Sequence, residues 1–345
     1  MPAVVPKRAS DMRVLVVTNL WPSPHRPAYG TFIRSQVESL VGVDVETEVL
    51  VIEGKRSRSA YADAVAEVRR RVRSGRFDVV HAHYGYSGWV ALCQRRLPVV
   101  ISFLGDDIQG TFLEDGKLHW KSRVIAAVNR RTARGAGAVI VKTEAMRRRL
   151  GMPGAHVIPN GVDLDLFRPL DRTEARQKLA LPPDRTLVLF AGDPDVAVKR
   201  HPLALAAVEK LARKRDIDLL VARGRPQEEM PLWFNAANAL LLASRSEGSP
   251  NVVKEAMACN LPVVATDVGD VAWLLERSPG NRVVPATVEP ESALADLLAR
   301  ALDDVVESGR TTGRDAMAEL SLPAVARRIR EVYTSVIPAG VGETG

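Results

Sequence analysis

The chain has 345 residues, of which 46% are hydrophobic and 26% are charged, a composition typical of a soluble globular protein with room for two domains. No stretch approaches the roughly 18 to 20 continuous apolar residues of a membrane-spanning helix, so no membrane span is expected. The two cysteines, Cys93 and Cys259, predict no disulfide framework, which favours the reducing cytoplasm.

The net charge of +7 is unevenly distributed along the sequence. Residues 1–170 carry 26 Lys and Arg against 16 Asp and Glu, whereas residues 171–345 carry 22 against 25. A basic surface can attract anionic lipid headgroups, so peripheral association with the inner face of the membrane is an alternative to a purely cytoplasmic location. An ordinary solvated surface explains the charge equally well. Nucleic acid is not an expected partner, because no aromatic residues interleave with the arginines. The basic clusters are Arg69–Arg71 with Arg73 and Arg76, Arg130 and Arg131 with Arg134, and Arg147–Arg149.

Residues 1–11 lack an apolar core and are expected to form a flexible leader. From residue 12 onward, short β-branched runs alternate with longer amphipathic stretches, which predicts parallel sheets with crossover helices. The runs are apolar throughout, as in strands that are covered on both faces. In the first half they are 13–17, 47–52, 78–82, 98–103 and 138–142.

Two connections in the first half carry candidate site residues. After the first strand, N-L-W-P-S-P-H-R-P-A-Y-G-T-F (19–32) contains Gly30, which could bring backbone amides against a phosphate; an ordinary strand-to-helix connection is the alternative. After the fourth strand, Asp106 and Asp107 could bind a ligand hydroxyl or cap the following turn. His81 and His83 face the same way at the end of the third strand, but neither has an obvious further ligand, so no metal is expected.

Residues 156–169 combine two prolines with an Asn-Gly pair and predict a hinge. A second set of apolar runs follows, so we expect an α/β fold of two doubly wound Rossmann-like domains, at 12–165 and 170–320, with a ligand site in the cleft at the carboxyl ends of the strands. The amphipathic stretch 321–337 is expected to join the N-terminal domain, and 338–345 to form a flexible tail. The second set comprises 186–191, 217–222, 239–244, 262–266 and 282–285.

The connection after the first strand of the second half reads G-D-P-D-V-A-V-K-R-H (192–201). Gly192 lets the backbone turn close to a ligand. Lys199 and Arg200 could neutralise an anionic leaving group such as a diphosphate, whose charge grows as a bond breaks.

The stretch E-G-S-P-N-V-V-K-E (247–255) directly follows a predicted buried strand. Ser249 is a preferred N-cap and Pro250 is preferred at the first helical position, so a helix is expected to run to about Cys259, with Asn260 as a left-handed stop. The free amides at the helix start would face the cleft and form an anion site at the positive end of the helix dipole. These are the amides of Asn251, Val252 and Val253.

Two glutamates flank this helix start. Glu255 lies six residues beyond the expected cap, which is about 9 Å along a helix at roughly 1.5 Å per residue. A carboxylate accepts hydrogen bonds from both hydroxyls of a vicinal diol, so the spacing fits Glu255 on a ribose, the amides on a diphosphate and Glu247 on a sugar. Gly248 belongs to the same expected site. The alternative is that Glu247 caps the helix and Glu255 is an ordinary solvated residue.

The block S-E-G-S-P-N-V-V-K-E-A-M-A-C-N-L-P-V-V-A-T-D-V-G-D (246–270) resembles the Glu–seven residues–Glu motif of retaining glycosyltransferases of family 4, which have the GT-B fold. P-N-G-V-D (159–163) resembles the interdomain segment of that family, and H-A-H (81–83) a block of its N-terminal domain. The similarity extends over most of residues 13–337, with the motifs in the same order.

The resemblance implies a GT-B fold, a nucleotide-diphosphate sugar as the donor and no required cofactor. In that family the first glutamate contacts the transferred sugar and the second the ribose, a lysine like Lys199 faces the diphosphate, and a glycine like Gly30 lies beside the phosphates. Relatives commonly carry histidine where Leu104 stands and arginine where Asp193 stands. Arg200 is therefore expected to supply the second cation, with an exposed side chain as the alternative.

We expect a retaining glycosyltransferase with Glu247, Lys199 and Asp106 as catalytic residues and His83 on the acceptor side. The acceptor is expected to be a saccharide or lipid-linked saccharide in cell-surface polysaccharide, exopolysaccharide or glycolipid synthesis. No nucleophile–base pair is apparent, so the departing phosphate would take the acceptor proton while Lys199 and the helix amides stabilise its charge. Two alternatives stay open: a nucleotide-sugar epimerase of the same fold, and a non-catalytic regulator that binds a nucleotide or a saccharide.

Overall fold

A computed structural model describes residues 12–54, 59–110 and 119–338 of the chain; the expected leader at 1–11 and nearly all of the expected tail lie outside the described residues. The first half forms a six-stranded parallel sheet in the order β2-β1-β3-β4-β5-β6. The five strands predicted there are all present, and β6 is an addition too short to produce a sequence pattern. The strands are β1 (Met12–Thr18), β2 (Val45–Val51), β3 (Val79–His83), β4 (Val99–Ser102), β5 (Ala138–Val141) and β6 (His156–Val157).

The second half forms a five-stranded parallel sheet in the order β11-β10-β9-β7-β8. Both sheets are doubly wound, which confirms the predicted fold class of two Rossmann-like domains. In such a sheet, ligands bind where the strand order reverses, here beyond the carboxyl ends of β1 and β3 and of β7 and β9. The strands are β7 (Thr186–Phe190), β8 (Ile217–Val221), β9 (Ala239–Leu242), β10 (Val263–Thr266) and β11 (Arg282–Val284).

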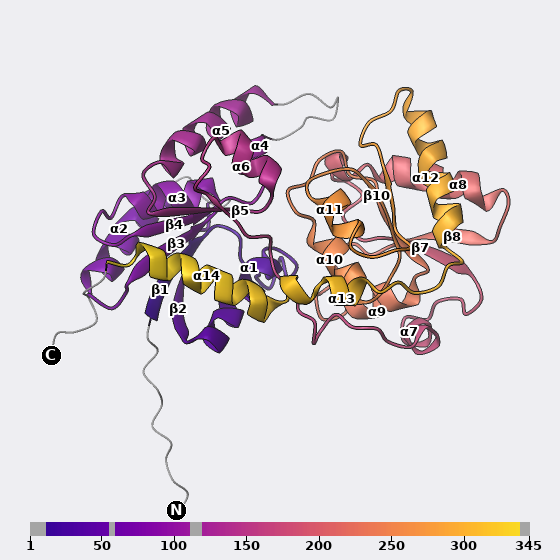
Figure 1. Cartoon of the computed structure of the whole chain (residues 1–345), viewed down its shortest axis with the longest axis horizontal. Helices are drawn as coiled ribbons and strands as arrows, with labels where there is room; N and C mark the ends of the chain where they lie inside the picture. The colour runs from indigo at the N-terminus through magenta and orange to yellow at the C-terminus, as the bar shows by residue number, and fades with distance from the viewer. Residues whose placement is uncertain (1–11, 55–58, 111–118, 339–345) are drawn as a thin grey trace, which may run out of the picture.

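Helices cover both faces of each sheet (Figure 1). Along β1, Leu15 and Val17 belong to one buried cluster and Val14 and Val16 to another, because successive side chains of a strand point to opposite faces. This double burial explains why the predicted runs are apolar throughout. The N-terminal helices are α1 (Thr31–Ser39), α2 (Ser59–Arg73), α3 (Gly85–Leu92), α4 (Asp106–Gln109), α5 (Trp120–Ala133) and α6 (Glu144–Leu150). The later helices are α7 (Arg172–Lys178), α8 (His201–Ala212), α9 (Met230–Ala236), α10 (Asn251–Ala258), α11 (Val271–Leu275), α12 (Glu291–Val305), α13 (Gly313–Ala316) and α14 (Leu322–Val336).

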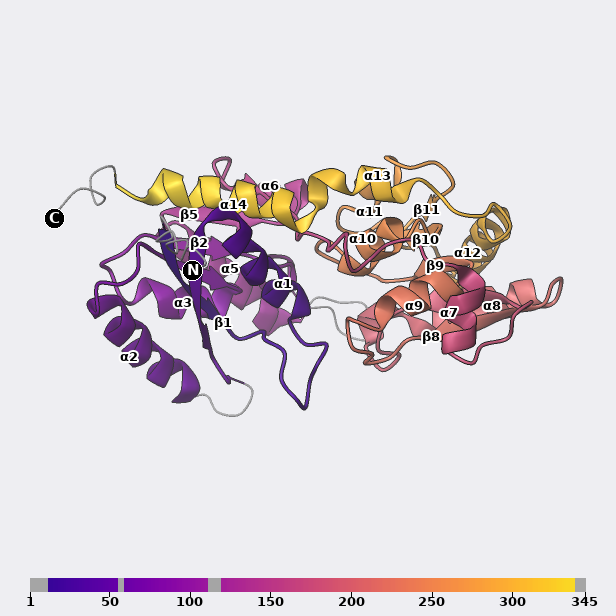
Figure 2. The same cartoon turned by 90° about the horizontal axis from the view of Figure 1, so that it is seen from below.

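The last helix returns to the N-terminal domain. Figures 1 and 2 both show α14 running along the N-terminal domain, away from the C-terminal domain that contains α12. Val325 and Ile329 are buried in the core around β1, and the Tyr333 hydroxyl lies 2.6 Å from Nδ1 of His81 on β3. The chain therefore crosses between the domains twice.

The two crossings lie side by side. The Val162 amide donates to the Leu320 carbonyl (2.8 Å) and the Leu322 amide donates to the Val162 carbonyl (3.0 Å). Two backbone hydrogen bonds thus join the segment around Val162 to the start of α14. The two interdomain connections are therefore expected to move together when the domains move relative to each other.

Gly30→Ala is expected to destabilise the protein more than Gly75→Ala. Both glycines have left-handed backbone, with φ of 75° and 73°. A Cβ on Gly30 would lie 2.6 Å from the Leu20 carbonyl, whereas one on Gly75 would meet nothing within 4 Å. Gly75→Ala therefore measures the left-handed strain alone, about 1–2 kcal/mol, and Gly30→Ala should lose about 1–3 kcal/mol more from the clash. Urea unfolding measures both; equal losses would contradict the packing argument.

Candidate functional site

A cleft of about 680 Å³ lies between the two domains. The N-terminal domain contributes the loop at 25–31, and the C-terminal domain contributes the segments that follow β7 and β8 together with the first turns of α10. Arg34 of α1 and Glu228 bridge the domains at the rim, 3.2 Å apart. The cleft therefore occupies the position that the strand order of the two sheets predicts.

Glu255 lines this cleft from α10, beside Val252 and across from Gly192. It is partly buried, and burial raises the pKa of its carboxyl from the ordinary 4.5 to about 7. An ionised carboxyl at such a partly buried position lowers the stability of the fold. Because it also lines the cleft, a binding role fits Glu255 better than that of an ordinary solvated helix residue. Gly192 has ordinary backbone geometry, and a Cβ there would meet only van der Waals contacts at 3.5 Å or more.

The start of α10 differs from the prediction. Ser249 does not cap the helix: its hydroxyl donates to Oδ2 of Asp270 (2.7 Å) and accepts from Nζ of Lys254 (3.0 Å). Pro250 is the N-cap residue, and the helix begins at Asn251. The Val253 amide donates to the Pro250 carbonyl (3.2 Å), so the expected anion site is reduced to the amides of Asn251 and Val252.

The end of α10 is as predicted. Asn260 has φ of 56°, and the Leu261 amide donates to the Ala256 carbonyl at 2.9 Å, while the Asn260 amide donates to Met257 at 2.9 Å. This pair of bonds is the Schellman motif, in which a left-handed residue satisfies the last carbonyls of a helix.

Lys254, the residue before Glu255, is a functional candidate that sequence reasoning missed. It is 0% exposed, and its Nζ donates to the Asn160 carbonyl (2.9 Å) as well as to Ser249. Burial lowers the pKa of this ammonium to about 8. The side-chain Nδ2 of Asn160 also donates to Oδ1 of Asn251 (3.3 Å), so the interdomain segment is tied directly to the start of α10.

Lys199 and Glu247, both predicted catalytic residues, form an ion pair. Nζ of Lys199 lies 2.5 Å from Oε1 of Glu247, and the Ser244 hydroxyl donates to the same oxygen at 2.7 Å. Both side chains are partly buried at the carboxyl ends of β7 and β9. The ammonium of Lys199 and the carboxylate of Glu247 therefore lie together beyond the ends of two neighbouring strands, where the strand order of the sheet reverses.

The prediction that Arg200 binds the donor is wrong. Its side chain is only 6% exposed, and its guanidinium donates to the backbone carbonyls of Ala243 (2.7 Å), Ser244 (3.0 Å) and Ala286 (3.0 Å). These carbonyls occupy the donors that a phosphate would need. Arg200 instead fixes the strand ends that carry Ser244 and Glu247.

Arg223 and Arg225, which sequence reasoning missed, line the cleft from the end of β8. Arg223 pairs with Asp193 (3.1 Å), the residue that stands where relatives carry arginine, and with Asp195 (2.6 Å), so a phosphate would have to displace these carboxylates. Arg225 lies over the Trp233 ring at 4.7 Å. A guanidinium therefore reaches this part of the cleft from the neighbouring strand. The signal in the sequence was an R-G-R triplet directly after an apolar run.

Arg200→Met is expected to lower stability, whereas Arg223→Met is expected to weaken nucleotide binding. Arg200→Met leaves buried carbonyls without a charged donor and should lower the free energy of unfolding by about 2–4 kcal/mol. Arg223 is about half exposed, so Arg223→Met should change stability by less than about 1 kcal/mol and weaken UDP binding about tenfold. Urea unfolding and calorimetric titration of each variant measure the two quantities; a loss of affinity confined to Arg200→Met would contradict this assignment.

Asp106 and Asp107 have separate roles in the structure. Asp107 is buried and accepts the Leu104 amide (3.0 Å) and the Gly105 amide (2.9 Å), so it caps the turn, and burial raises the pKa of its carboxyl to about 7. Asp106 is exposed to a second cavity of about 1160 Å³ and accepts the Tyr84 hydroxyl at 3.3 Å. Burial among its neighbours raises the pKa of the Asp106 carboxyl, although the cavity leaves the group open to solvent.

The expectation that His83 lies on the acceptor side is wrong. Its side chain is 1% exposed and lines neither cavity, and its ring centroid lies 4.2 Å from that of His81. The two histidines share a face, as predicted, but Tyr333 shows that it is the face covered by α14. Burial holds the pKa of His83 well below its usual range.

Gly248 brings the two sides of the site together. A Cβ on this residue would lie 2.5 Å from the Leu104 carbonyl oxygen and 3.3 Å from Cα of Gly105, both in the N-terminal domain. The loop that carries Asp106 therefore contacts the loop that carries Glu247. Gly30, at the N-cap of α1, is packed against Leu20 rather than open to the cleft, while its neighbour Thr31 lines the cleft.

No group of three or more His, Cys, Asp or Glu side chains is arranged to hold a metal ion within residues 12–54, 59–110 and 119–338. In the same part of the chain, none of the helices has the length and apolar character needed to cross a membrane.

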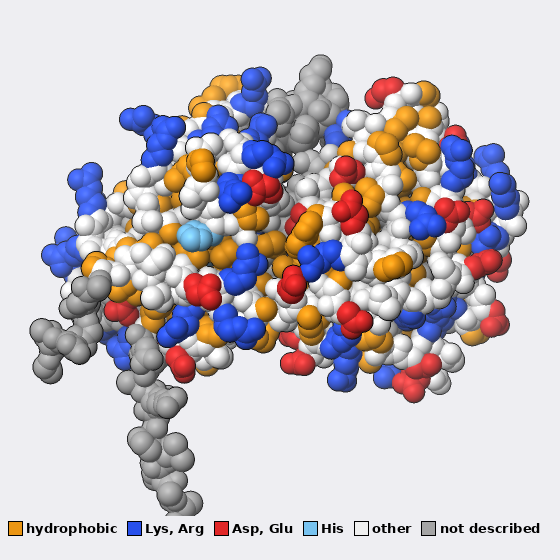
Figure 3. Space-filling view, viewed as in Figure 1, with side chains coloured by type: hydrophobic (Ala, Val, Ile, Leu, Met, Phe, Trp, Pro, Cys, Tyr) orange, Lys and Arg blue, Asp and Glu red, His pale blue; other side chains and the backbone are white. Residues whose placement is uncertain are grey.

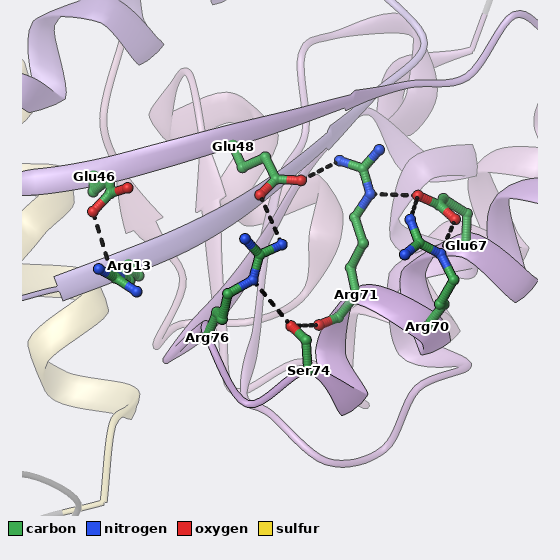
Figure 4. Close-up of polar contacts among 8 residues, drawn as sticks. All are labelled: Arg13, Glu46, Glu48, Glu67, Arg70, Arg71, Ser74 and Arg76. Atoms are coloured by element: carbon green, nitrogen blue, oxygen red, sulfur yellow. Dashed lines mark hydrogen bonds and ion pairs between the residues drawn. The ribbon is translucent and has the colours of Figure 1, made fainter.

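Three of the five arginines in the basic cluster at 69–76 pair with two neighbouring acids (Figure 4). Arg70 and Arg71 both contact Glu67 at 2.6 Å, and Arg71 and Arg76 contact Glu48 at 2.7 and 3.6 Å. The hydrogen bonds from the two arginines lower the pKa of Glu67 to about 2. On the face shown in Figure 3, Lys and Arg still outnumber Asp and Glu over the N-terminal half, while the two kinds are mixed over the other half.

Comparison with known proteins matches the two halves of the chain to two family models, "Glycosyl transferase 4-like domain" over residues 7–161 and "Glycosyl transferases group 1" over residues 186–304. D-inositol 3-phosphate glycosyltransferase 1 of Catenulispora acidiphila is 30% identical over 319 residues, covering 78% of this chain and 74% of the relative. D-inositol 3-phosphate glycosyltransferase of Xylanimonas cellulosilytica is 30% identical over 310 residues, covering 78% and 72%.

Solved structures share the fold. Sucrose-phosphate synthase from Thermosynechococcus elongatus superimposes with a TM-score of 0.73 at 19% identity, covering 94% of this chain and 99% of that one. Anabaena Alr3699/HepE in complex with UDP and glucose gives a TM-score of 0.66 at 17% identity, covering 94% and 100%. With both domains matched in order and the two sheets facing each other across a cleft, the chain belongs to the glycosyltransferases that join a 4-like domain to a group 1 domain in the GT-B fold.

Proposed function

We propose that the protein is a retaining glycosyltransferase that moves a hexose from a nucleotide-diphosphate sugar to a hydroxyl acceptor. The observation that carries this proposal is the position of the Lys199–Glu247 pair. Lys199 and Glu247 line neither of the two cavities themselves, but Gly248, next to Glu247, packs against Leu104 and Gly105 of the loop that leads to Asp106 and the second cavity. Donor and acceptor would therefore meet at one point.

In this proposal the donor lies in the interdomain cleft. Glu255 accepts the ribose hydroxyls, the amides of Asn251 and Val252 and the Arg223 guanidinium face the diphosphate, and Glu247 accepts hydroxyls of the transferred sugar. Arg225, which is stacked on the buried Trp233, lines the cleft and offers its guanidinium plane to the base. The solved complex of Alr3699/HepE with UDP and glucose supports UDP as the first nucleotide to test.

The proposed chemistry takes place on the front face of the sugar. The acceptor oxygen forms its bond to the anomeric carbon as the bond from that carbon to the β-phosphate oxygen breaks, and the departing phosphate takes the acceptor proton. Lys199 offsets the charge that grows on this phosphate, and Asp106 holds the acceptor hydroxyl. Glu247 is held by Lys199 and Ser244, which suits a residue that positions the sugar more than a nucleophile.

The large cavity beside Asp106 favours transfer over the alternatives. An epimerase works on the donor alone and needs no second cavity, and a non-catalytic regulator needs no lysine–glutamate pair at the junction. We propose cell-surface polysaccharide or glycolipid synthesis on the cytoplasmic side of the membrane as the cellular role, supported by the excess of positive charge in the first 170 residues.

The test is turnover of UDP-, GDP- and ADP-glucose with and without a hydroxyl acceptor, followed by proton NMR of the anomeric signal. We expect one nucleotide to support acceptor-dependent release of the diphosphate and an α-linked product from an α-linked donor. A β-linked product would contradict retention. Conversion of the donor to an epimer without an acceptor would favour the epimerase.

A further inference from the structure

The cavity beside Asp106 is lined mainly by aromatic and aliphatic side chains. Four of the five tyrosines in the chain line it, together with Trp89 and Phe32. Tyr29 lines both this cavity and the donor cleft, so the two spaces meet there. Pockets of this size with apolar walls and a few polar groups are typical small-molecule sites. The tyrosines are Tyr29, Tyr61, Tyr84 and Tyr86.

The aromatic side chains form a connected wall. The Tyr86 ring contacts Trp89 edge to face at 4.9 Å between centroids, Tyr84 at 5.7 Å and Tyr61 at 5.8 Å. Asn19 donates to the Tyr61 hydroxyl at 3.3 Å and holds the far end of the wall. Rings supported by one another in this way present a large apolar area whose binding costs little side-chain entropy.

The cavity beside Asp106 differs in charge from the donor cleft. Asp106 is the one charged side chain among the described residues that line it, whereas the donor cleft is lined by charges of both signs, from Arg26, Arg223 and Arg225 and from Asp193 and Glu255. Burial, and after it the charge of Asp106, raises the pKa of the Tyr84 hydroxyl. An anion bound directly beside Asp106 would be repelled by this carboxylate.

We infer that the acceptor is an uncharged alcohol with a flat or otherwise apolar body, rather than an anionic one such as a phosphorylated cyclitol. The inference rests on the proposed function. The body lies against the Tyr86–Trp89 wall, and its hydroxyl is held by Asp106 beside the Lys199–Glu247 pair. That oxygen bonds to the anomeric carbon as the bond to the β-phosphate breaks, and the proton leaves with the phosphate.

The test compares the binding of three probes to the full chain by calorimetry, with and without saturating UDP. The probes are 2-(2-naphthyl)ethanol, the dianion 2-naphthyl phosphate, and D-myo-inositol 3-phosphate. We expect the alcohol to bind at least tenfold more tightly than either anion. Trp89→Ala should weaken binding of the alcohol about tenfold, whereas Trp273→Ala, which removes an exposed tryptophan of α11, should leave it unchanged.

Asp106→Asn removes the negative charge of this side chain while nearly keeping its shape, so it tests the effect of the charge alone on binding. It removes the carboxylate from an exposed position, so the fold should persist, and the affinity for 2-naphthyl phosphate should rise severalfold toward that of the alcohol. Tighter binding of either anion by the unaltered chain, or no change on Asp106→Asn, would overturn the inference. If Trp89→Ala fails to fold, as judged by loss of its UDP-induced thermal shift, the Asp106→Asn result decides.

The outcomes also distinguish this inference from the proposed function. If no nucleotide sugar is bound or consumed, the proposed function fails, whatever the probes do. If a donor is consumed while an anionic acceptor is preferred, only the acceptor assignment fails.

Discussion

Lys199→Met is expected to lower kcat by about 10²- to 10³-fold while changing nucleotide affinity much less. The ammonium group lies 2.5 Å from Glu247 and, in the proposed mechanism, faces a β-phosphate whose charge grows only as the glycosidic bond breaks. Interactions that strengthen in the transition state appear in kcat rather than in ground-state binding, and loss of one such donor commonly costs this much. Steady-state kinetics with the donor identified in the turnover screen measures the effect.

A matched control is available on the surface. Lys210→Met removes another lysine–carboxylate pair, in which Nζ lies 2.5 Å from Oδ1 of Asp296, and it should leave kcat unchanged. Both variants should lose no more than about 1 kcal/mol of stability, because partly exposed ion pairs contribute little. If Lys199→Met raised KM and left kcat unchanged, Lys199 would bind the donor equally in the ground state and in the transition state. It would then not stabilise the leaving group.

The strands could be predicted because burial on both faces leaves a clear trace in the sequence. Ten apolar runs became ten strands, while the two residues of β6 carry no such trace. Local signals also located the left-handed stop at Asn260, which depends only on the turn after α10.

The wrong predictions concern side chains whose hydrogen-bond partners lie far away in the sequence. Ser249 has the chemistry of an N-cap, but Asp270, 21 residues later, takes its hydroxyl. Arg200 stands beside Lys199 in sequence, yet carbonyls 43 and 86 residues away bind its guanidinium. Neither contact can be read from local pattern, because each depends on which strand lies beside which.

The same reason explains what was missed. Arg223 reaches the cleft because β8 pairs with β7, which places the end of one strand beside the loop that follows the other. The aromatic wall is assembled from residues of the loop after β1 and of α2 and α3, and no single stretch of sequence contains it. A residue supplied by a neighbouring element leaves no signal in the motif that it completes, which is why these two features were missed.

Glu255→Gln is expected to stabilise the free protein at pH 8 and to abolish most of its affinity for nucleotide. Burial raises the pKa of this carboxyl from 4.5 to about 7, so between these values the folded chain binds more protons than the unfolded chain. Stability therefore falls as pH rises from 4.5 to 7, and the full cost, on the order of 3 kcal/mol, is present above pH 7. Removing the charge should recover much of it at pH 8 and little at pH 4.5.

Binding should change in the opposite direction. A hydrogen bond to a charged group contributes about 1.5–3 kcal/mol, so loss of the carboxylate should weaken UDP binding at pH 8 by about 10- to 100-fold. The unaltered chain should also bind UDP less tightly as pH falls below about 7 and Glu255 takes up its proton. Glu209→Gln, at an exposed position of α8, serves as the control and should alter neither quantity. Urea unfolding and UDP titration at both pH values provide the measurements. A variant that is less stable than the parent at pH 8 and still binds UDP would show that Glu255 is a structural residue.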